Sequence, residues 1–140
     1  MFYLDTSLLV TALTLETKTD VIQRWLATQL PEETVISDWV ITEFSAALSI
    51  KIRSRQLDAD GRSRALSEFY VMTKIMGQIY PVSAHHFRTA TQLANQYALG
   101  LRAGDALHLA IASDYFATLV TRDRKLAEAA STLGIAAQFL

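Results

Sequence analysis

The chain has 140 residues and a mass of 15.6 kDa, which is the size of one domain. Thirteen basic and 14 acidic residues give a formal net charge of −1, which argues against a protein that coats DNA by neutralising many phosphates. The absence of cysteine excludes disulfides, thiolate zinc sites, iron–sulfur clusters and cysteine nucleophiles. Because 51% of the residues are apolar and the mean hydropathy is +0.19, we expect a packed core and some exposed apolar surface for a partner.

No segment has the pattern of a membrane span or an export signal. The apolar stretch 8–15 contains two threonines and follows Asp5, and no basic residues precede it as they would in a secretory signal. No run reaches the roughly 18 apolar residues of a spanning helix. We therefore expect a cytoplasmic protein with a single domain over residues 1–140.

Apolar spacing predicts strands that alternate with helices along the whole chain. In chain order the expected elements are a strand over 1–4, helices over 6–16 and 20–30, a strand over 34–37, helices over 38–52 and 62–78, a strand over 79–82, helices over 86–99 and 106–116, a strand over 118–121, a helix over 124–133 and a strand over 135–140. Asp38 is the expected N-cap of its helix, and Pro81 suits an edge strand. This alternation is typical of an α/β fold whose parallel sheet is covered by helices on both faces.

Four acidic residues lie where such a fold brings its strand ends together. Asp5 ends the first strand, and Asp123 lies two residues beyond the fourth. Asp105 opens the apolar helix 106–116, and Glu43 lies in the second turn of the helix that follows the second strand. Because the carboxyl ends of parallel strands share one edge, where ligands bind, we expect the four carboxylates to converge there.

A cluster of carboxylates needs a counter-charge. Two of them about 5 Å apart repel by roughly 3 kcal/mol at an effective dielectric of ~20. Mg²⁺ and Mn²⁺ accept oxygen ligands without histidine or cysteine, and such ions commonly act on phosphates by orienting and activating water. The sequence therefore predicts a divalent-metal site for phosphate chemistry.

Each of these acids also has a structural explanation. The three aspartates lie at or next to predicted helix starts, where aspartate is favoured as a cap. Glu43 is too deep in its helix to cap it and borders the apolar stripe that begins at Val40, so its alternative is a salt bridge to a basic side chain. Asp114 is nine residues from Asp105 and points to the opposite helix face, so we leave it out of the site.

Four segments together resemble a known family. They are YLDTSLLV (3–10), ISDWVITEFSAAL (36–48), LRAGDALHLAIA (101–112) and LVTRDRKLAEAA (119–130). Their order, their separations and the total length resemble the PIN-domain ribonucleases, specifically the VapC-like toxins of type II toxin–antitoxin modules. The resemblance covers essentially the whole chain.

This resemblance implies a three-layer α/β sandwich with a central five-stranded parallel sheet. It also implies a Mg²⁺- or Mn²⁺-dependent endoribonuclease that hydrolyses RNA phosphodiesters, forms a homodimer and is inhibited by a small cognate antitoxin. Carried over by motif, Asp5 and Asp105 are the most direct metal ligands. Glu43 and Asp123 complete the ligand shell or bind a second ion.

The polar neighbours of these acids have open roles. Thr6, Ser7 and Thr121 offer hydroxyls for water or phosphate, or simply cap helices and close turns. Arg102 suits a phosphate or a neighbouring acid. His108 is either a proton shuttle or a packed, hydrogen-bonded histidine, and we favour the packed role.

Surface roles are expected for two further groups. His85 and His86 lie near a helix start and are expected at the surface. A basic group can follow an RNA backbone or form a solvated loop. Its members are Lys51, Arg53, Arg55, Arg62 and Arg64.

Two other functions fit parts of the pattern. A non-catalytic PIN-fold protein that binds a partner peptide or RNA fits the hydropathy, but it has little use for four clustered acids. A haloacid-dehalogenase-type phosphatase needs a second aspartate two residues after Asp5, where Ser7 stands.

Overall fold

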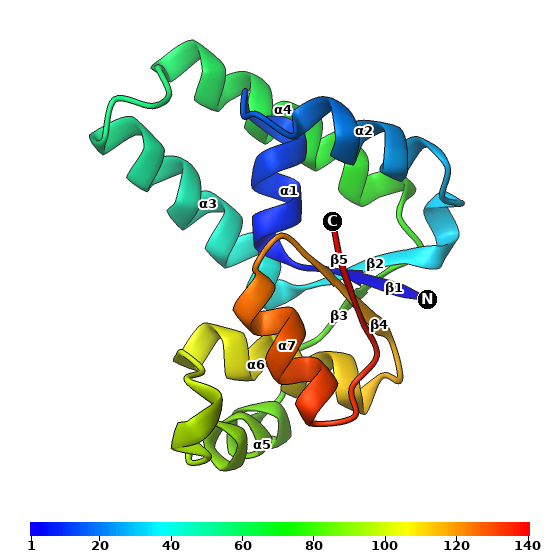
Figure 1. The fold of residues 1–140 in the computed structure, drawn as a ribbon. Coiled ribbons are helices and arrows are strands. Elements are labelled where there is room, and N and C mark those ends of the chain that lie inside the picture. Colours follow the sequence, from blue (N-terminus) through cyan, green and yellow to red (C-terminus); the bar gives the residue numbers. More distant parts are fainter.

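Five short parallel strands form the central sheet of the computed structural model, which describes all 140 residues (Figure 1). The strands are β1 (Phe2–Leu4), β2 (Thr34–Ser37), β3 (Gln78–Tyr80), β4 (Thr118–Thr121) and β5 (Ala137–Phe139). Their order in the sheet is β3-β2-β1-β4-β5. The predicted five-stranded parallel sheet is therefore confirmed.

Seven helices cover the sheet. They are α1 (Thr6–Leu13), α2 (Thr19–Ala27), α3 (Asp38–Arg53), α4 (Ala59–Ile75), α5 (Ala84–Ala94), α6 (Ala103–Asp114) and α7 (Arg124–Thr132). In Figure 1, α1 to α4 lie above the sheet and α5 to α7 lie below it, so the fold has the three layers expected from the sequence. No helix combines the length and the apolar character needed to cross a bilayer.

The strand order creates a switch point between β1 and β4. The chain moves outward from β1 through β2 to β3, then returns to the other side of β1 to form β4 and β5. In open parallel sheets, ligands bind beyond the carboxyl ends of the strands that flank such a switch point. The fold thus defines a position for a site before any side chain is considered.

Strands β1 and β4 and helix α6 form the buried centre of the fold. Tyr3, Leu4, Leu119 and Val120 are completely buried, which matches their apolar runs in strands covered on both faces. Every residue of α6 from Ala106 to Ala112 is buried, as its nearly all-round apolar character predicts.

Several element boundaries differ from the sequence prediction by a few residues, and three of the differences have a clear local cause. The N-cap of α3 is Ser37 rather than Asp38, because the Ser37 hydroxyl accepts the Val40 N–H. Helix α1 ends at Leu13, because the backbone of Thr14 is extended. The expected helix 86–99 is two pieces, α5 and a 3₁₀ turn over Tyr97–Leu99 that ends at Gly100 in the left-handed conformation.

Candidate active site

A cleft of about 590 Å³ opens at the switch point of the sheet. Asp5 enters it from the end of β1, and Glu43 enters it from α3. Asp105 comes from the first turn of α6, and Asp123 from the turn between β4 and α7. All four acids singled out in the sequence therefore line one cleft.

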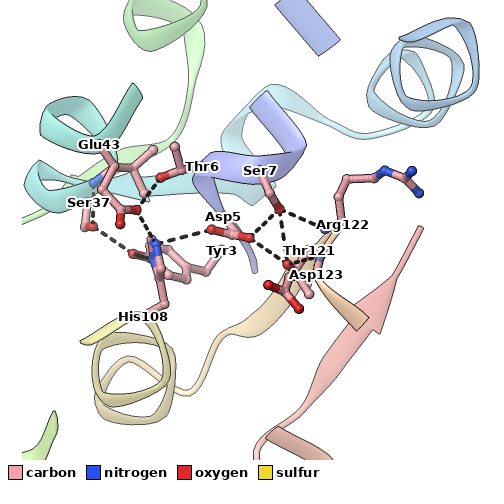
Figure 2. A network of polar contacts seen from close by, with 11 residues as sticks. Tyr3, Asp5, Thr6, Ser7, Ser37, Glu43, His108, Thr121, Arg122 and Asp123 are labelled. Atoms are coloured by element: carbon pink, nitrogen blue, oxygen red, sulfur yellow. Dashed lines mark hydrogen bonds and ion pairs between the residues drawn. The ribbon is translucent and has the colours of Figure 1, made fainter. Parts of the chain in front are cut away.

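Asp5 is the most buried of these acids, with 4% of its surface exposed. Its backbone N–H donates to the Val120 carbonyl at 3.0 Å, which extends the pairing of β1 and β4 by one residue. Its side chain does not cap α1. Instead Oδ2 accepts hydrogen bonds from Ser7 Oγ at 2.5 Å and Thr121 Oγ1 at 2.6 Å, while Oδ1 lies 3.2 Å from His108 Nε2 (Figure 2).

Glu43 reaches the cleft from the opposite side. Its Oε2 accepts the Thr6 hydroxyl at 2.7 Å and lies 2.6 Å from His108 Nε2 (Figure 2). Burial alone would raise the pKa of Glu43, but the contacts with His108 and Thr6 outweigh it and hold the pKa below its ordinary value. The structural alternative for Glu43, an ion pair with a basic side chain, is present as this contact with His108.

His108 completes a tight cluster with these two acids. It is only 2% exposed. Burial alone would lower the pKa of His108, but the hydrogen bond to Glu43 and the charges of Asp5 and Glu43 raise it above the ordinary value. The metal-binding atoms of Asp5, Glu43 and His108 all lie within 4.8 Å of one another.

Asp105 and Asp123 lie in the same cleft but outside this cluster. Asp105 Oδ2 accepts the Arg102 backbone N–H at 3.0 Å, and Asp123 Oδ1 caps α7 by accepting two backbone N–H groups. Both residues thus have the capping roles that were the structural alternative. Their second carboxylate oxygens make no hydrogen bond within the protein and remain available to a ligand.

The electrostatic state of Asp105 follows from its neighbours. Burial raises its pKa, the Arg102 N–H opposes this, and the charges of Asp123 and Asp5 add to the increase. The acids of the cleft therefore repel one another in the absence of a cation, as the sequence argument requires.

The three hydroxyls flagged in the sequence all contact acids. Thr6 donates to Glu43, whereas Ser7 and Thr121 both donate to Asp5. Sequence reasoning missed Tyr3, whose hydroxyl contacts His108 Nδ1, and Ser37, whose hydroxyl contacts that of Tyr3. A signal existed for Tyr3, because alternate residues of a strand point to the same side and Tyr3 lies two residues before Asp5.

One glycine in α6 makes room for the Glu43 side chain. A β-carbon added to Gly104 would lie 2.7 Å from Glu43 Oε1. The absent side chain therefore leaves the space that the Glu43 carboxylate occupies beside the first turn of α6.

Two histidines lie away from the cleft. His86 is buried rather than at the surface, so that expectation is wrong, and its Nε2 lies 3.0 Å from Asp114 Oδ2. His85 is exposed, with Nε2 3.7 Å from Asp114 Oδ1. Asp114 thus pairs with histidines of α5 and does not line the cleft.

The fold and cleft define a class of α/β proteins in which acids from separate segments gather at the switch point of a parallel sheet. The family model described as "PIN domain" matches residues 2–131. The chain therefore belongs to the PIN-domain family, as the four segments predict. No curated protein sequence matches it.

Solved structures show the same fold at low sequence identity. FitAcB from Neisseria gonorrhoeae has a TM-score of 0.76 and 20% identity, and the match covers 100% of this chain and 97% of that one. VapC20 of Mycobacterium tuberculosis, described as a sarcin-ricin loop cleaving toxin, has a TM-score of 0.75 and 15% identity, and the match covers 97% of each chain. VapBC2 of Rickettsia felis, described as bound to a DNA fragment from its promoter, has a TM-score of 0.70 and 19% identity, and the match covers 100% of this chain and 99% of that one.

Proposed function

We propose that this protein is a divalent-metal-dependent endoribonuclease and the toxin of a type II toxin–antitoxin pair. The observation that carries the proposal is the convergence of Asp5 and Glu43, 38 positions apart in the sequence, at the switch point of the sheet with their metal-binding atoms within 4.8 Å. Asp105 and Asp123 border the same cleft with free carboxylate oxygens. A binding surface without a cation gains nothing from four acids in one cleft.

The residues present fit a Mg²⁺ or Mn²⁺ ion. Carboxylate oxygens are the ligands that both ions accept. Burial raises the pKa of Asp105 and the charges of Asp123 and Asp5 add to the increase, so a bound cation would stabilise its charged form. Asp5 and Glu43 would hold the ion, with Asp105 and Asp123 completing the shell or holding a second one. The bound ion would supply a Lewis acid for phosphate and lower the pKa of water.

The protein's own groups position the reaction. Ser7 and Thr121 fix one oxygen of Asp5 and leave the other facing the cleft. Thr6 fixes one oxygen of Glu43 in the same way. Hydrolysis forms a bond from a water oxygen to phosphorus and breaks the bond to the ribose oxygen, which takes a proton. No covalent enzyme intermediate is expected, because the cleft has no activated nucleophile.

RNA is the proposed substrate because one neighbour of the same fold is described as cleaving the sarcin-ricin loop. Arg122 lines the cleft and offers a positive charge to an RNA backbone. The basic residues of the α3–α4 connection, beginning at Arg53, are exposed and extend that charge beyond the cleft.

An antitoxin and a second copy of the chain are the proposed partners. Leu15, Tyr97 and Phe116 are each more than nine-tenths exposed, which leaves apolar surface for a partner to cover. Two neighbours of the fold are described as FitAB and VapBC2 bound to DNA, names that join a toxin to its antitoxin. Light scattering would measure the mass of the protein alone and after co-expression with a short neighbouring gene.

The direct experiment is cleavage of a labelled oligoribonucleotide and of ribosomal RNA. We expect cleavage with Mg²⁺ or Mn²⁺, none with EDTA, and a rate lower by about 100-fold or more in Asp5→Asn, because the substitution removes a ligand charge. Asp114→Asn is the matched control outside the cleft, and it should keep the wild-type rate. Cleavage that survives chelation, or that persists in Asp5→Asn, would contradict the proposal.

A non-catalytic binding protein is the second candidate, and the exposed apolar residues favour it as much as they favour a toxin. It predicts that divalent ions leave the stability of the protein unchanged.

A further inference from the structure

His108 has the geometry of a metal ligand as well as that of a buried, hydrogen-bonded histidine. Its Nε2 lies 2.6 Å from Glu43 Oε2 and 3.2 Å from Asp5 Oδ1, so it points between the two carboxylates (Figure 2). It lines the same cleft as those acids. The resemblance to PIN-domain ribonucleases assigns metal binding to the four acids and gives this position no such role.

The opposite side of the imidazole ring is held by a buried chain of hydrogen bonds. His108 Nδ1 lies 2.9 Å from the Tyr3 hydroxyl, which lies 2.8 Å from Ser37 Oγ. Ser37 Oγ also accepts the Val40 N–H. Without an ion, Nε2–H donates to Glu43 Oε2. If an ion replaced that proton, Nδ1–H would donate to the Tyr3 oxygen and the Tyr3 O–H to Ser37, and the Nε2 lone pair would face the ion. Histidines that bind metals commonly donate their second N–H to a buried acceptor in this way.

The separations suit a shared ion. Adjacent ligands of an octahedral ion, each about 2.2 Å from the metal, lie about 3.1 Å apart. The distance between His108 Nε2 and Asp5 Oδ1 is close to this value, and the distance to Glu43 Oε2 is shorter by about 0.5 Å. A small movement of the Glu43 side chain, which is 27% exposed, would open that contact.

The other two histidines lack this geometry. His86 Nδ1 accepts the Ser83 N–H, so its Nε2 carries a proton and donates to Asp114. His85 is exposed and contacts a single carboxylate. His108 alone therefore places one ring nitrogen, Nε2, against two acids at once.

We propose that His108 Nε2 is a metal ligand, and that the mixed set of one imidazole and two carboxylates makes this site prefer Mn²⁺ over Mg²⁺. Imidazole nitrogen suits transition-metal ions, whereas Mg²⁺ favours oxygen ligands and retains water. The proposal deepens the metal-dependent function proposed above, and it rests on that function only for the presence of an ion in the cleft.

Spectroscopy of the wild-type protein loaded with Mn²⁺ tests the ligand directly. A nitrogen bound to Mn²⁺ gives a ¹⁴N coupling in the electron spin echo, and we expect that coupling in the wild type and in the control His85→Asn. It should be lost in His108→Asn. A wild-type spectrum without the coupling overturns the proposal, whatever the variants do.

Affinity measurements test the selectivity. Mn²⁺ binding is read from the signal of the free ion, and Mg²⁺ binding from its competition. His108→Asn should weaken Mn²⁺ binding by at least about tenfold more than Mg²⁺ binding, because only Mn²⁺ gains from the imidazole. Tyr3→Phe removes the support of Nδ1 and should weaken Mn²⁺ binding by about 10-fold to 100-fold. Equal losses for both ions in His108→Asn would mean that His108 only positions the acids, which overturns the proposal.

The two proposals fail in different experiments. EDTA-sensitive RNA cleavage without a ¹⁴N coupling would leave the nuclease function in place and remove the role of His108. A ¹⁴N coupling without cleavage of any RNA would do the reverse.

Discussion

One buried hydroxyl joins two of the acids in the cleft. Thr121 Oγ1 donates to Asp5 Oδ2 at 2.6 Å and accepts the Asp123 backbone N–H at 2.9 Å. Its side chain is completely buried at the end of β4. Hydrogen bonds to a buried carboxylate stabilise more than neutral ones do, because the unpaired charge would keep its full cost of desolvation.

Thr121→Val keeps the shape of this side chain and removes its hydrogen bonds. We expect it to lower the free energy of unfolding by about 1–3 kcal/mol in EDTA at neutral pH, because Asp5 loses a donor and the Asp123 N–H loses an acceptor. Chemical denaturation measures the change. Thr118→Val is the control in the same strand, because the Thr118 side chain makes no hydrogen bond. A loss no larger in Thr121→Val than in Thr118→Val would contradict this account.

At the scale of residues, the sequence predicted which acids meet and could not predict how each is used. Asp5 and Asp123 follow strands, so topology alone brings them to one edge. The spacing from Asp105 places His108 on nearly the same helix face, but the rotation of α6 against α3 is set by packing in three dimensions. That rotation directs His108, rather than Asp105, into the tight cluster with Glu43.

Helices α1 and α3 are joined by an ion pair beyond the cleft. Glu16, in the loop after α1, lies 2.7 Å from Lys51 Nζ in the last turn of α3, and it accepts the Thr11 hydroxyl at 2.9 Å. Burial alone would raise the pKa of Glu16, but Lys51 and Thr11 outweigh it and lower the pKa below its ordinary value.

This lowered pKa predicts a pH dependence of stability. A carboxylate whose pKa is lower in the folded state contributes stability above its unfolded pKa and loses it as the pH falls through the folded value. Glu16→Gln should therefore be less stable than the wild type by about 1 kcal/mol or less at pH 7. The difference should shrink below about pH 4.5 and vanish at lower pH.

Thermal unfolding of both proteins across this pH range measures the effect. Asp20→Asn is the matched control, because the Asp20–Arg24 pair lies within one helix and both side chains are more than two-thirds exposed. That variant should show little pH-dependent difference from the wild type. A Glu16→Gln difference that persists at the lowest pH would show that packing, rather than the ion pair, is responsible.

For helices and strands, the sequence predicted which elements form better than it predicted the residues at which they begin and end. Strands β2 and β4 have their predicted bounds, because each β-branched run there ends at a charged residue. Helix α4 begins at Ala59, three residues earlier than expected, because Asp58 caps it by accepting the Gly61 N–H at 2.7 Å. The sequence offers both Asp58 and Asp60 as caps, and spacing alone does not choose between them.

The whole molecule is needed to form the site. His108 lies 103 positions beyond Asp5, and its cluster takes one residue each from β1's end, α3 and α6. An unfolded chain keeps none of these separations. A metal ion bound by the cluster therefore binds the folded state almost exclusively, and the free energy of binding becomes free energy of folding.

Divalent ions should accordingly raise the melting temperature. At a free Mn²⁺ concentration about 100 times the dissociation constant, the gain is about 2.7 kcal/mol, which corresponds to a rise of roughly 10 °C for a domain of this size. Differential scanning calorimetry after treatment with EDTA measures the shift. Asp5→Asn should lose most of it, whereas Asp114→Asn, whose carboxylate lies outside the cleft, should keep it. A wild-type protein that melts at the same temperature with and without Mn²⁺ would favour the non-catalytic binding protein, because the acids would then gather without any cation to hold them together.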